Sequence, residues 1–135
     1  MSFHKLNPIL IPILFLTFGI AQDYSIQDAI DSANDGGVVY VPSGTYDETI
    51  TVNKSLVITG LGLVNITGGA VIAADDVTLD NLSLSGRPSQ KNTVIWVDGS
   101  AVRNNVTIND CVLDGESSGK YAFYGSNSLT GDLVF

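Results

Sequence analysis

Apolar and polar residues alternate in two segments of the chain that match each other at a fixed spacing. Residues 77–86 read VTLDNLSLSG and residues 106–115 read VTINDCVLDG, so the second segment repeats the first 29 positions later. Within each copy, apolar residues lie two apart on both sides of an Asp/Asn pair. This alternation predicts two short strands joined by a tight corner, with one face of each strand apolar.

A second match lies just before each copy. Residues 71–75 align with residues 94–98 at a spacing of 23, which places Trp96 opposite Ala73. The six-residue difference between the two spacings predicts a loop insertion at residues 99–104. The pattern therefore predicts three short strands in each repeat of about 23–29 residues. Such a repeat cannot bury its apolar face alone and is typical of a β-solenoid, in which successive turns stack on one another.

The first part of the chain pairs a short predicted helix with strands. Residues 25–34 carry a narrow apolar stripe at helical spacing, Ser25 can cap the first turn with Asp28 as its partner, and Gly36 follows the last turn. A strand is predicted directly afterwards, at residues 38–41. A helix this narrow must pack on something, and we expect it to close the first open end of the solenoid core.

The first residues of the chain predict an export signal. Lys5 gives a charged start, an apolar run follows, and a small-x-small triplet ends at Ala21. The apolar run is short for a membrane span and contains Pro12. We therefore expect a signal peptide at residues 1–21, one mature domain at residues 22–135, and a secreted, cell-surface or periplasmic location.

The pattern at the other end of the chain predicts an open stack. Residues 121–125 read as the start of a further turn, and no polar capping repeat or closing helix follows them. A solenoid without a cap exposes its last turn to water and to edge pairing. The sequence therefore predicts either a C-terminally incomplete chain or an end that docks onto another molecule, including a second copy.

Three segments, taken in order, resemble a known family. They are residues 24–30 (YSIQDAI), 39–48 (VYVPSGTYDE) and 54–60 (KSLVITG). They resemble the N-terminal part of the pectin lyase-like superfamily, which includes pectin methylesterases and periplasmic and surface β-helix proteins. The resemblance implies an all-β, right-handed parallel β-helix, here of about four coils, with an N-terminal capping α-helix. It covers nearly all of the mature chain and is specific for the fold rather than for function.

The segments that carry catalysis in the esterases of that family are not matched. Residues 92–96 read NTVIW where the esterases carry a catalytic glutamine, and residues 116–121 read ESSGKY where they carry another. The only histidine, His4, lies in the predicted signal peptide, so the mature chain lacks an imidazole for a nucleophilic triad or a typical zinc site. We therefore predict no catalytic residue in this chain.

Net charge and cysteine content narrow the function classes further. The formal charge is −8, and Lys and Arg form no cluster that could bind nucleic-acid phosphates. Cys111 is the only cysteine, so the chain cannot form an internal disulfide. Cys111 occupies the repeat position of Leu82, which predicts a buried and unreactive thiol.

Acidic and amide side chains recur at equivalent repeat positions. The spacing of 23 stacks Asp75 on Asp98, about 5 Å apart on successive turns, and Asp76 adds a third carboxylate. Because Ca²⁺ prefers several oxygen ligands, a calcium site at these residues is one hypothesis, and solvent-facing turn aspartates are the alternative. A corner ladder that satisfies backbone groups of the turns is predicted for four further residues, Asp80, Asn81, Asn109 and Asp110.

Aromatic and basic residues in and beside the repeats are candidates for binding carbohydrate. If Trp96 faces outward, it can stack on sugar rings together with Tyr121 and Tyr124; if it faces inward, it belongs to the core. Arg87 and Arg103 lie in loops, where a guanidinium can bind a sugar carboxylate or act as a lyase-type base. Ordinary loop arginines are the alternative.

Four Asn-x-Ser/Thr sequons are candidate glycosylation sites, at Asn53, Asn65, Asn81 and Asn105. Together these features predict a non-catalytic secreted or surface β-helix module that contacts polysaccharide or serves as an adhesin or structural protein. Two alternatives remain open. One is the front part of a polysaccharide lyase or pectin esterase-like enzyme with its active site downstream, and the other is a self-assembling structural subunit.

Overall fold

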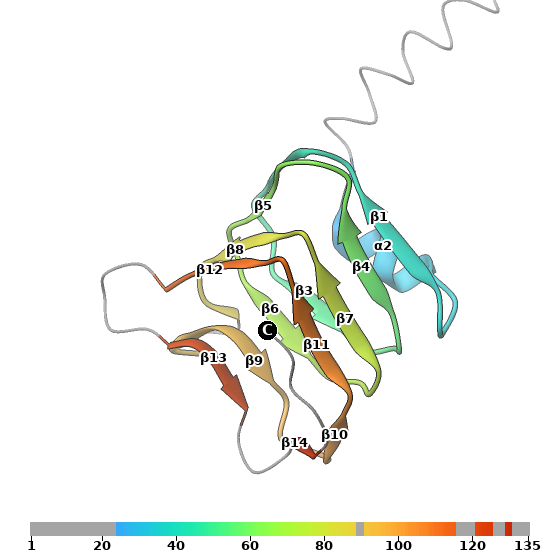
Figure 1. Ribbon diagram of the computed structural model, residues 1–135, viewed down its shortest axis with the longest axis vertical. Helices are drawn as coiled ribbons and strands as arrows, with labels where there is room; N and C mark the ends of the chain where they lie inside the picture. The colour runs from blue at the N-terminus through green and yellow to red at the C-terminus, as the bar shows by residue number, and fades with distance from the viewer. Residues whose placement is uncertain (1–23, 89–90, 116–120, 126–128, 131–135) are drawn as a thin grey trace, which may run out of the picture.

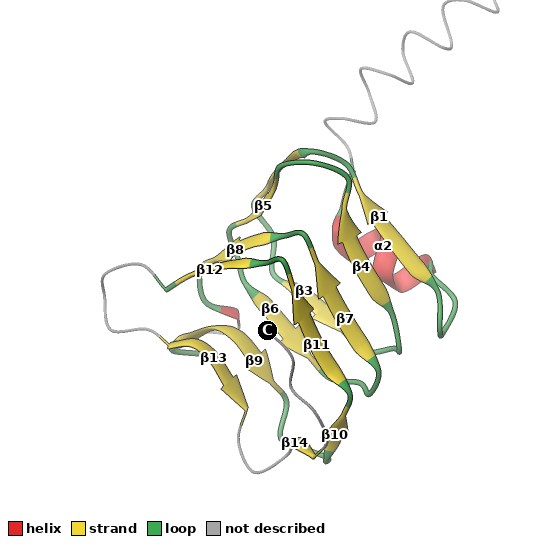
Figure 2. Cartoon of the chain, viewed as in Figure 1, coloured by secondary structure: helices red, strands yellow, loops and turns green. Residues whose placement is uncertain are grey.

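The computed structural model describes residues 24–88, 91–115, 121–125 and 129–130. They form one short helix and a series of short strands in stacked turns (Figures 1 and 2). The predicted signal peptide lies outside the described residues, and within them no helix is long and apolar enough to cross a membrane. In chain order the elements are α2 (Ile26–Ser32), β1 (Val38–Val41), β2 (Gly44–Tyr46), β3 (Ile50–Val52), β4 (Val57–Gly60), β5 (Val64–Ile66), β6 (Ala70–Ile72), β7 (Val77–Asp80), β8 (Ser83–Ser85), β9 (Thr93–Val97), β10 (Arg103–Asn104), β11 (Val106–Asn109), β12 (Val112–Asp114), β13 (Tyr121–Gly125) and β14 (Leu129–Thr130).

The strands form three sheets that the chain visits in turn. The first sheet contains β1, β4, β7 and β11, the second β2, β5, β8 and β12, and the third β3, β6, β9 and β13. Each circuit of the chain adds one strand to each sheet, and neighbouring strands run parallel (Figure 1). A short further pairing joins β10 to β14. The described chain is thus mostly β, with parallel strands in stacked sheets, and this arrangement is compatible with the predicted solenoid.

The strand register confirms the repeat of 29 residues. Val106 pairs with Val77 in the first sheet, and Leu113 pairs with Leu84 in the second. Leu79 and Leu84 face inward and are fully buried. Alternation within the repeat therefore predicted both the corner and the buried face correctly.

The spacing of 23 residues is wrong by two positions. In the third sheet Trp96 pairs with Val71, and Val97 pairs with Ile72, which is a spacing of 25. A shift of two residues leaves every side chain on the same face of its strand, so alternation alone cannot separate these two registers. Trp96 therefore lies opposite Val71 rather than the predicted Ala73.

The core consists of columns of aliphatic side chains that repeat from turn to turn. In the first sheet, Val39, Ile58 and Leu79 occupy paired positions, and all three are buried. In the second sheet, Ile66 pairs with Leu84, and both are fully buried. Burying one such side chain stabilises a fold by about 1.5–3 kcal/mol. The stacking of like side chains in successive turns is therefore the main source of stability.

Helix α2 covers the first turn of the stack, as predicted. Its apolar stripe places Ile26 and Ile30 in the core, where both are fully buried. The helix is shorter than the predicted range of residues 25–34 and ends at Ser32. The reason is that Ala33 already has an extended backbone, with φ −70° and ψ 147°, which directs the chain toward β1.

The N-terminus of α2 is capped from within the helix and from the first turn. Ser25 is the N-cap, and its hydroxyl oxygen accepts a hydrogen bond from the Asp28 backbone N–H at 3.2 Å, as predicted. The carboxylate partner is not Asp28, however, but Glu48 from the loop before β3. Glu48 accepts hydrogen bonds from the backbone N–H groups of Ile26 (2.8 Å) and Gln27 (3.1 Å) and from the Ser25 hydroxyl (3.1 Å). A carboxylate at this position also complements the helix dipole.

Two other side chains complete the junction between α2 and the first turn. The Gln27 amide donates to the Thr51 carbonyl (3.2 Å) and accepts from the Thr51 N–H (2.7 Å), so it takes the place of a neighbouring strand at the edge of β3. The Lys54 ammonium donates to three carbonyl oxygens at the end of the helix, those of Ile30 (3.1 Å), Asp31 (2.6 Å) and Ala33 (2.9 Å).

The corners beside the first sheet are built by Asp and Asn residues whose side chains join successive turns, as the predicted corner ladder requires, although Asn81 bonds a backbone carbonyl and Asp80 and Asn109 bond each other. Left-handed backbone conformations are tolerated best by Gly, Asn and Asp. The Asn81 amide donates to the Gly60 carbonyl (2.9 Å), and the Asn109 amide donates to Asp80 (2.6 Å). Four corner residues have φ between +48° and +54°, namely Asp76, Asn81, Asn105 and Asp110.

The Asp80 contacts predict a loss of stability in acid. The Thr59 hydroxyl and then the Asn109 amide donate hydrogen bonds that hold the pKa of Asp80 below its ordinary value. A carboxyl whose pKa is lower in the folded state stabilises the fold above the unfolded pKa, and this stabilisation is lost as pH falls through the folded pKa. Urea unfolding below about pH 4 should therefore show a smaller pH dependence for Asp80→Asn than for the wild type. Equal slopes would contradict this account.

Candidate ligand-binding site

Trp96 lies on the outer face of the third sheet. Its neighbours along β9, Ile95 and Val97, are fully buried, whereas Trp96 is half-buried, so alternation points its ring away from the core. Of the two orientations that the sequence left open, the outward one is correct. The next strand of the sheet is β13, which lies beside β9 (Figure 1). Its register places Tyr124 directly opposite Trp96.

The rings of Trp96 and Tyr124 are stacked on each other. Their centroids lie 5.1 Å apart and their planes differ by 5°. Neighbouring strands are only about 4.8 Å apart, so two outward aromatic residues in register meet face to face. The Lys91 ammonium lies 4.3 Å from the centroid of the Trp96 ring, in a cation–π contact. The sheet register and a cation from the loop before β9 thus hold the aromatic pair in place.

A shallow pocket of about 140 Å³ opens beside this stack, lined by Asn92, Thr93, Trp96, Tyr121 and Tyr124. Tyr121 is 64% exposed and Tyr124 is 42% exposed, so both rings offer surface to a ligand. The Thr93 hydroxyl donates to the carbonyl oxygen of Ile95 in its own strand (2.8 Å). The pocket is much smaller than cavities that enclose drug-sized ligands. It therefore suits one ring of a longer molecule that passes over the surface.

The described lining residues offer binding groups but no carboxylate pair. Their side chains are an indole, two phenols, an amide and an aliphatic hydroxyl, and none of them is a carboxylate, an imidazole or a thiol. Cys111, at the corner between β11 and β12, is partly buried rather than fully buried like Leu82. Burial raises the pKa of the Cys111 thiol, which disfavours the reactive thiolate.

The two arginines predicted to accompany the aromatic residues do not line the pocket. Arg87 is exposed after the end of β8. Arg103 lies in β10, which forms the last part of the predicted insertion at residues 99–104. Its guanidinium is 3.6 Å from the carboxylate of Asp98 and 3.4 Å from the hydroxyl of Ser100. The structure thus brings the three predicted aromatic residues together and leaves both arginines outside the pocket lining.

Lys91 and Asn92 are members of the site that sequence reasoning missed. Both lie between β8 and β9, where no strand alternation assigns a side chain to a face. The signal that was present is their position directly before the strand that carries Trp96. A strand that carries an outward aromatic residue draws attention to the loop that precedes it, because that loop can border the same surface.

Comparisons with known proteins find no match. No protein-family model, no curated protein and no solved structure matches this chain.

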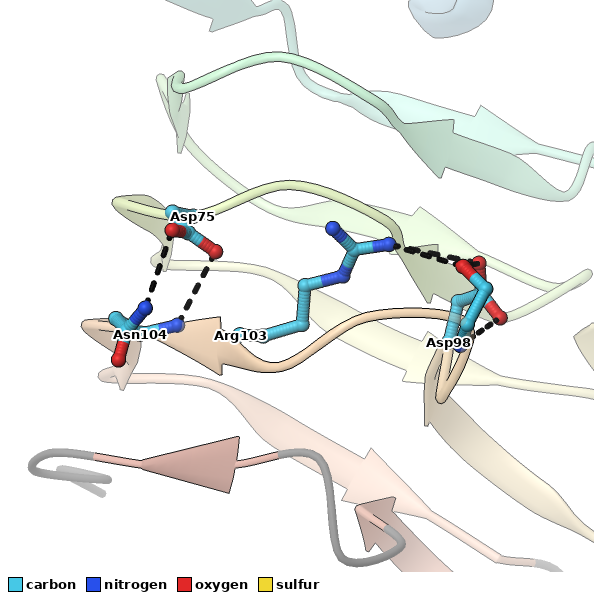
Figure 3. Close-up of polar contacts among 5 residues, drawn as sticks. Asp75, Asp98, Arg103 and Asn104 are labelled. Atoms are coloured by element: carbon cyan, nitrogen blue, oxygen red, sulfur yellow. Dashed lines mark hydrogen bonds and ion pairs between the residues drawn. The ribbon is translucent and has the colours of Figure 1, made fainter.

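The predicted stacking of Asp75 on Asp98 is wrong (Figure 3). Asp75 accepts two hydrogen bonds from Asn104, one from its backbone N–H and one from its side-chain amide, both at 3.2 Å. Asp98 lies instead beside Arg103 and Ser100 in the turn after β9. Hydrogen bonds from Ser100, more than the charge of Arg103, hold the pKa of Asp98 below its ordinary value. The corrected register of the third sheet is the reason for this separation.

The three carboxylates of the calcium hypothesis therefore do not converge. The remaining one, Asp76, accepts a hydrogen bond from the amide of Asn105 at 2.7 Å. Among the residues that the structure describes, no group of three His, Cys, Asp or Glu side chains is placed to hold a metal ion. Amide groups of the next turn donate to Asp75 and Asp76, so these two pairs join one turn to the next.

The four sequon asparagines differ in what they contact. Asn53 is exposed in the turn after β3, and Asn65 is half-buried on the outer face of β5. The side chains of Asn81 and Asn105 donate to a carbonyl and a carboxylate of neighbouring turns. A sugar on either of these two nitrogens would crowd a corner contact. Asn53 is therefore the most accessible acceptor of the four.

A second hollow, of about 90 Å³, lies at the corner between the first and second sheets. Its walls come from Gly62, Leu63, Val64, Asn81, Leu82, Ser83, Asp110 and Val112. Leu63 is 74% exposed and Val112 is 63% exposed, so its rim is apolar. The lining residues that the structure describes include no aromatic ring and a single charged side chain, Asp110. It offers fewer groups for specific recognition than the aromatic pocket.

Proposed function

We propose that this chain is an exported, non-catalytic module of the right-handed parallel β-helix type that binds polysaccharide through the aromatic pocket of the third sheet. The observation that carries the proposal is the Trp96–Tyr124 stack on the outer face of the sheet, beside the exposed ring of Tyr121. Rigid aromatic rings offer apolar faces to sugar rings, and phenol hydroxyls offer hydrogen bonds to sugar hydroxyls. A shallow, open pocket suits a polymer, which binds along a surface.

The proposed relation to the pectin lyase-like superfamily is supported by the contacts of its characteristic residues. Gln27, Glu48 and Lys54 all belong to the three segments that carry the resemblance. Each of them joins α2 to the first turn. Gln27 does so at the edge of β3, Glu48 at the start of the helix and Lys54 at its end. A residue pattern that closes the end of a stack of parallel strands is what a capped β-helix requires.

The module is proposed to be non-catalytic because the described lining residues of the pocket include no pair of carboxylates. Hydrolysis uses a pair of carboxylic acids on either side of the scissile bond. Elimination uses a base together with a group that stabilises the negative charge. A tyrosine phenol could be the base, but none of the described lining residues is a cation that could stabilise the charge. None of the described lining residues is a carboxylate. The geometry therefore supports recognition of a glycan rather than its conversion.

Retention on insoluble polysaccharide tests this function. The full chain should be retained on at least one of cellulose, xylan and pectin, and its fluorescence should change on binding because Trp96 is the only tryptophan. Tyr124→Ala should reduce retention. Tyr40→Ala is the matched control, since Tyr40 is a 59% exposed tyrosine on the first sheet. Failure of the wild type to bind, or equal losses in both variants, would refute the proposal.

Export is tested separately. When the full chain is produced in a secreting host, the recovered protein should begin after Ala21, at Gln22 or Asp23. N-terminal sequencing and intact mass measure this directly. Recovery of the chain with its first residues attached would contradict a cleaved signal peptide and leave the glycan-binding test unaffected.

A further inference from the structure

The accessible aromatic surface of the pocket belongs to its tyrosines rather than to its tryptophan. Trp96 is half-buried, with the Tyr124 ring stacked against it and the Lys91 ammonium over its ring. Tyr124 and Tyr121 are 42% and 64% exposed. A ligand that approaches the pocket therefore meets the tyrosine rings first, while the stacked Trp96 ring fixes the position of the Tyr124 ring.

The charges of the site and of the chain disfavour an acidic ligand. The chain has 14 acidic and 6 basic residues, a formal charge of −8. None of the described lining residues is charged, and the nearby Lys91 is engaged with the Trp96 ring. Arg103, which the sequence offered as a partner for a sugar carboxylate, already pairs with Asp98. A polyanion would be repelled by the net charge over about 8 Å at physiological salt, and Lys91, the cation described beside the pocket, already lies over the Trp96 ring.

We propose that the pocket binds a neutral glycan, with one pyranose ring lying on Tyr124 and Tyr121 and with Trp96 as a positioning residue for Tyr124. This inference rests on the proposed function and names the class of its ligand. In β-linked glucose and xylose polymers the hydroxyls are equatorial, so each ring presents a face rich in C–H groups. Such a face packs on an aromatic ring, while the hydroxyls at the ring edge reach polar groups.

The test compares hexamers of β-1,4-linked glucose, β-1,4-linked xylose and galacturonate by titration calorimetry on the full chain. A neutral hexamer should bind at least about tenfold more tightly than the galacturonate hexamer at low salt. Tyr124→Ala should weaken its binding about tenfold, and Tyr124→Phe, which keeps the ring, should change it about twofold or less. Trp96→Phe should cost about threefold or less, because a ring remains beneath Tyr124. Circular dichroism should show that all three variants keep the wild-type fold.

The outcomes separate this inference from the proposed function. Tighter binding of the galacturonate hexamer would overturn the neutral class while leaving glycan binding intact. A tenfold loss in Trp96→Phe with no loss in Tyr124→Ala would make the tryptophan the binding surface and overturn the assigned roles. Absence of binding to all three hexamers by the wild type would overturn both proposals.

Discussion

Replacing Gly86 with alanine is expected to destabilise the fold by more than about 4 kcal/mol, which few single substitutions do. Gly86 follows β8 with φ +90°, a conformation that favours glycine. A Cβ at this position would overlap the carbonyl oxygen of Thr67 and lie 2.7 Å from its carbonyl carbon and 3.0 Å from the Gly68 Cα. All three are backbone atoms of the preceding turn. The turns would have to separate to accommodate the methyl group, which would expose the core between them.

Gly36→Ala is the matched control for this effect. Gly36 has φ +81°, close to that of Gly86, but nothing lies within 4 Å of a Cβ built on it. Gly36→Ala should therefore destabilise the fold only through the strain of its left-handed backbone, by about 1–2 kcal/mol. Both substitutions restrict the unfolded chain equally, so the difference between their urea midpoints reports the clash between turns. Equal losses in the two variants would show that the turns do not approach this closely in solution.

The sequence predicted the repeating strands well and the alignment of the third sheet poorly. The 29-residue repeat was identified by a distinctive corner, the Asp/Asn pair, which fixes the alignment to a single residue. The third strand of each turn has no such marker. Its residues alternate with a period of two, so spacings of 23 and 25 bury the same face, and only the contacts with the rest of the stack select the second.

The hydrogen-bond partners of three aspartates could have been predicted from the sequence, because the confirmed spacing of 29 residues also holds just before the repeat in which it was found. An asparagine lies 29 residues after each of these aspartates and donates a hydrogen bond to it. The pairs are Asp75–Asn104, Asp76–Asn105 and Asp80–Asn109. A carboxylate followed one turn later by an amide favours a structural ladder over a metal site, since the amide N–H groups satisfy the carboxylate oxygens.

The aromatic pocket was predicted only in part for a different reason. Trp96, Tyr121 and Tyr124 were recognised as candidates, but the orientation of Trp96 depends on which residues of β9 face the core, and four of its five residues are buried. Apolar and polar residues do not alternate along β9, so its sequence does not show which face meets the core. Stacking on Tyr124 follows from the register of β13, which is a contact between residues 28 positions apart. Lys91 and Asn92, from the loop before β9, also border the pocket, and strand alternation does not predict where loop side chains lie.

Glu48→Ala is expected to cost about 3 kcal/mol of stability and to lower the melting temperature by about 12 °C. The Glu48 carboxylate is half-buried and accepts hydrogen bonds from two backbone N–H groups and one hydroxyl at the start of α2. Hydrogen bonds to a charged group contribute about 1.5–3 kcal/mol each, and water replaces them incompletely when the donors stay partly buried. Loosening α2 also uncovers Ile26 and Ile30 at the end of the core.

Asp47→Ala is the control that separates this cap from a general loss of negative charge. Asp47 is the adjacent residue, is exposed, and accepts a single hydrogen bond from the Thr67 hydroxyl at 2.8 Å. Its removal should cost about 1 kcal/mol or less. Glu48→Gln should fall between the two, because its amide keeps one acceptor oxygen but turns an N–H group toward the donors of the helix. If thermal unfolding shows Glu48→Ala no less stable than Asp47→Ala, then burial of Ile26 and Ile30 alone holds the helix on the stack, and the carboxylate only orients it.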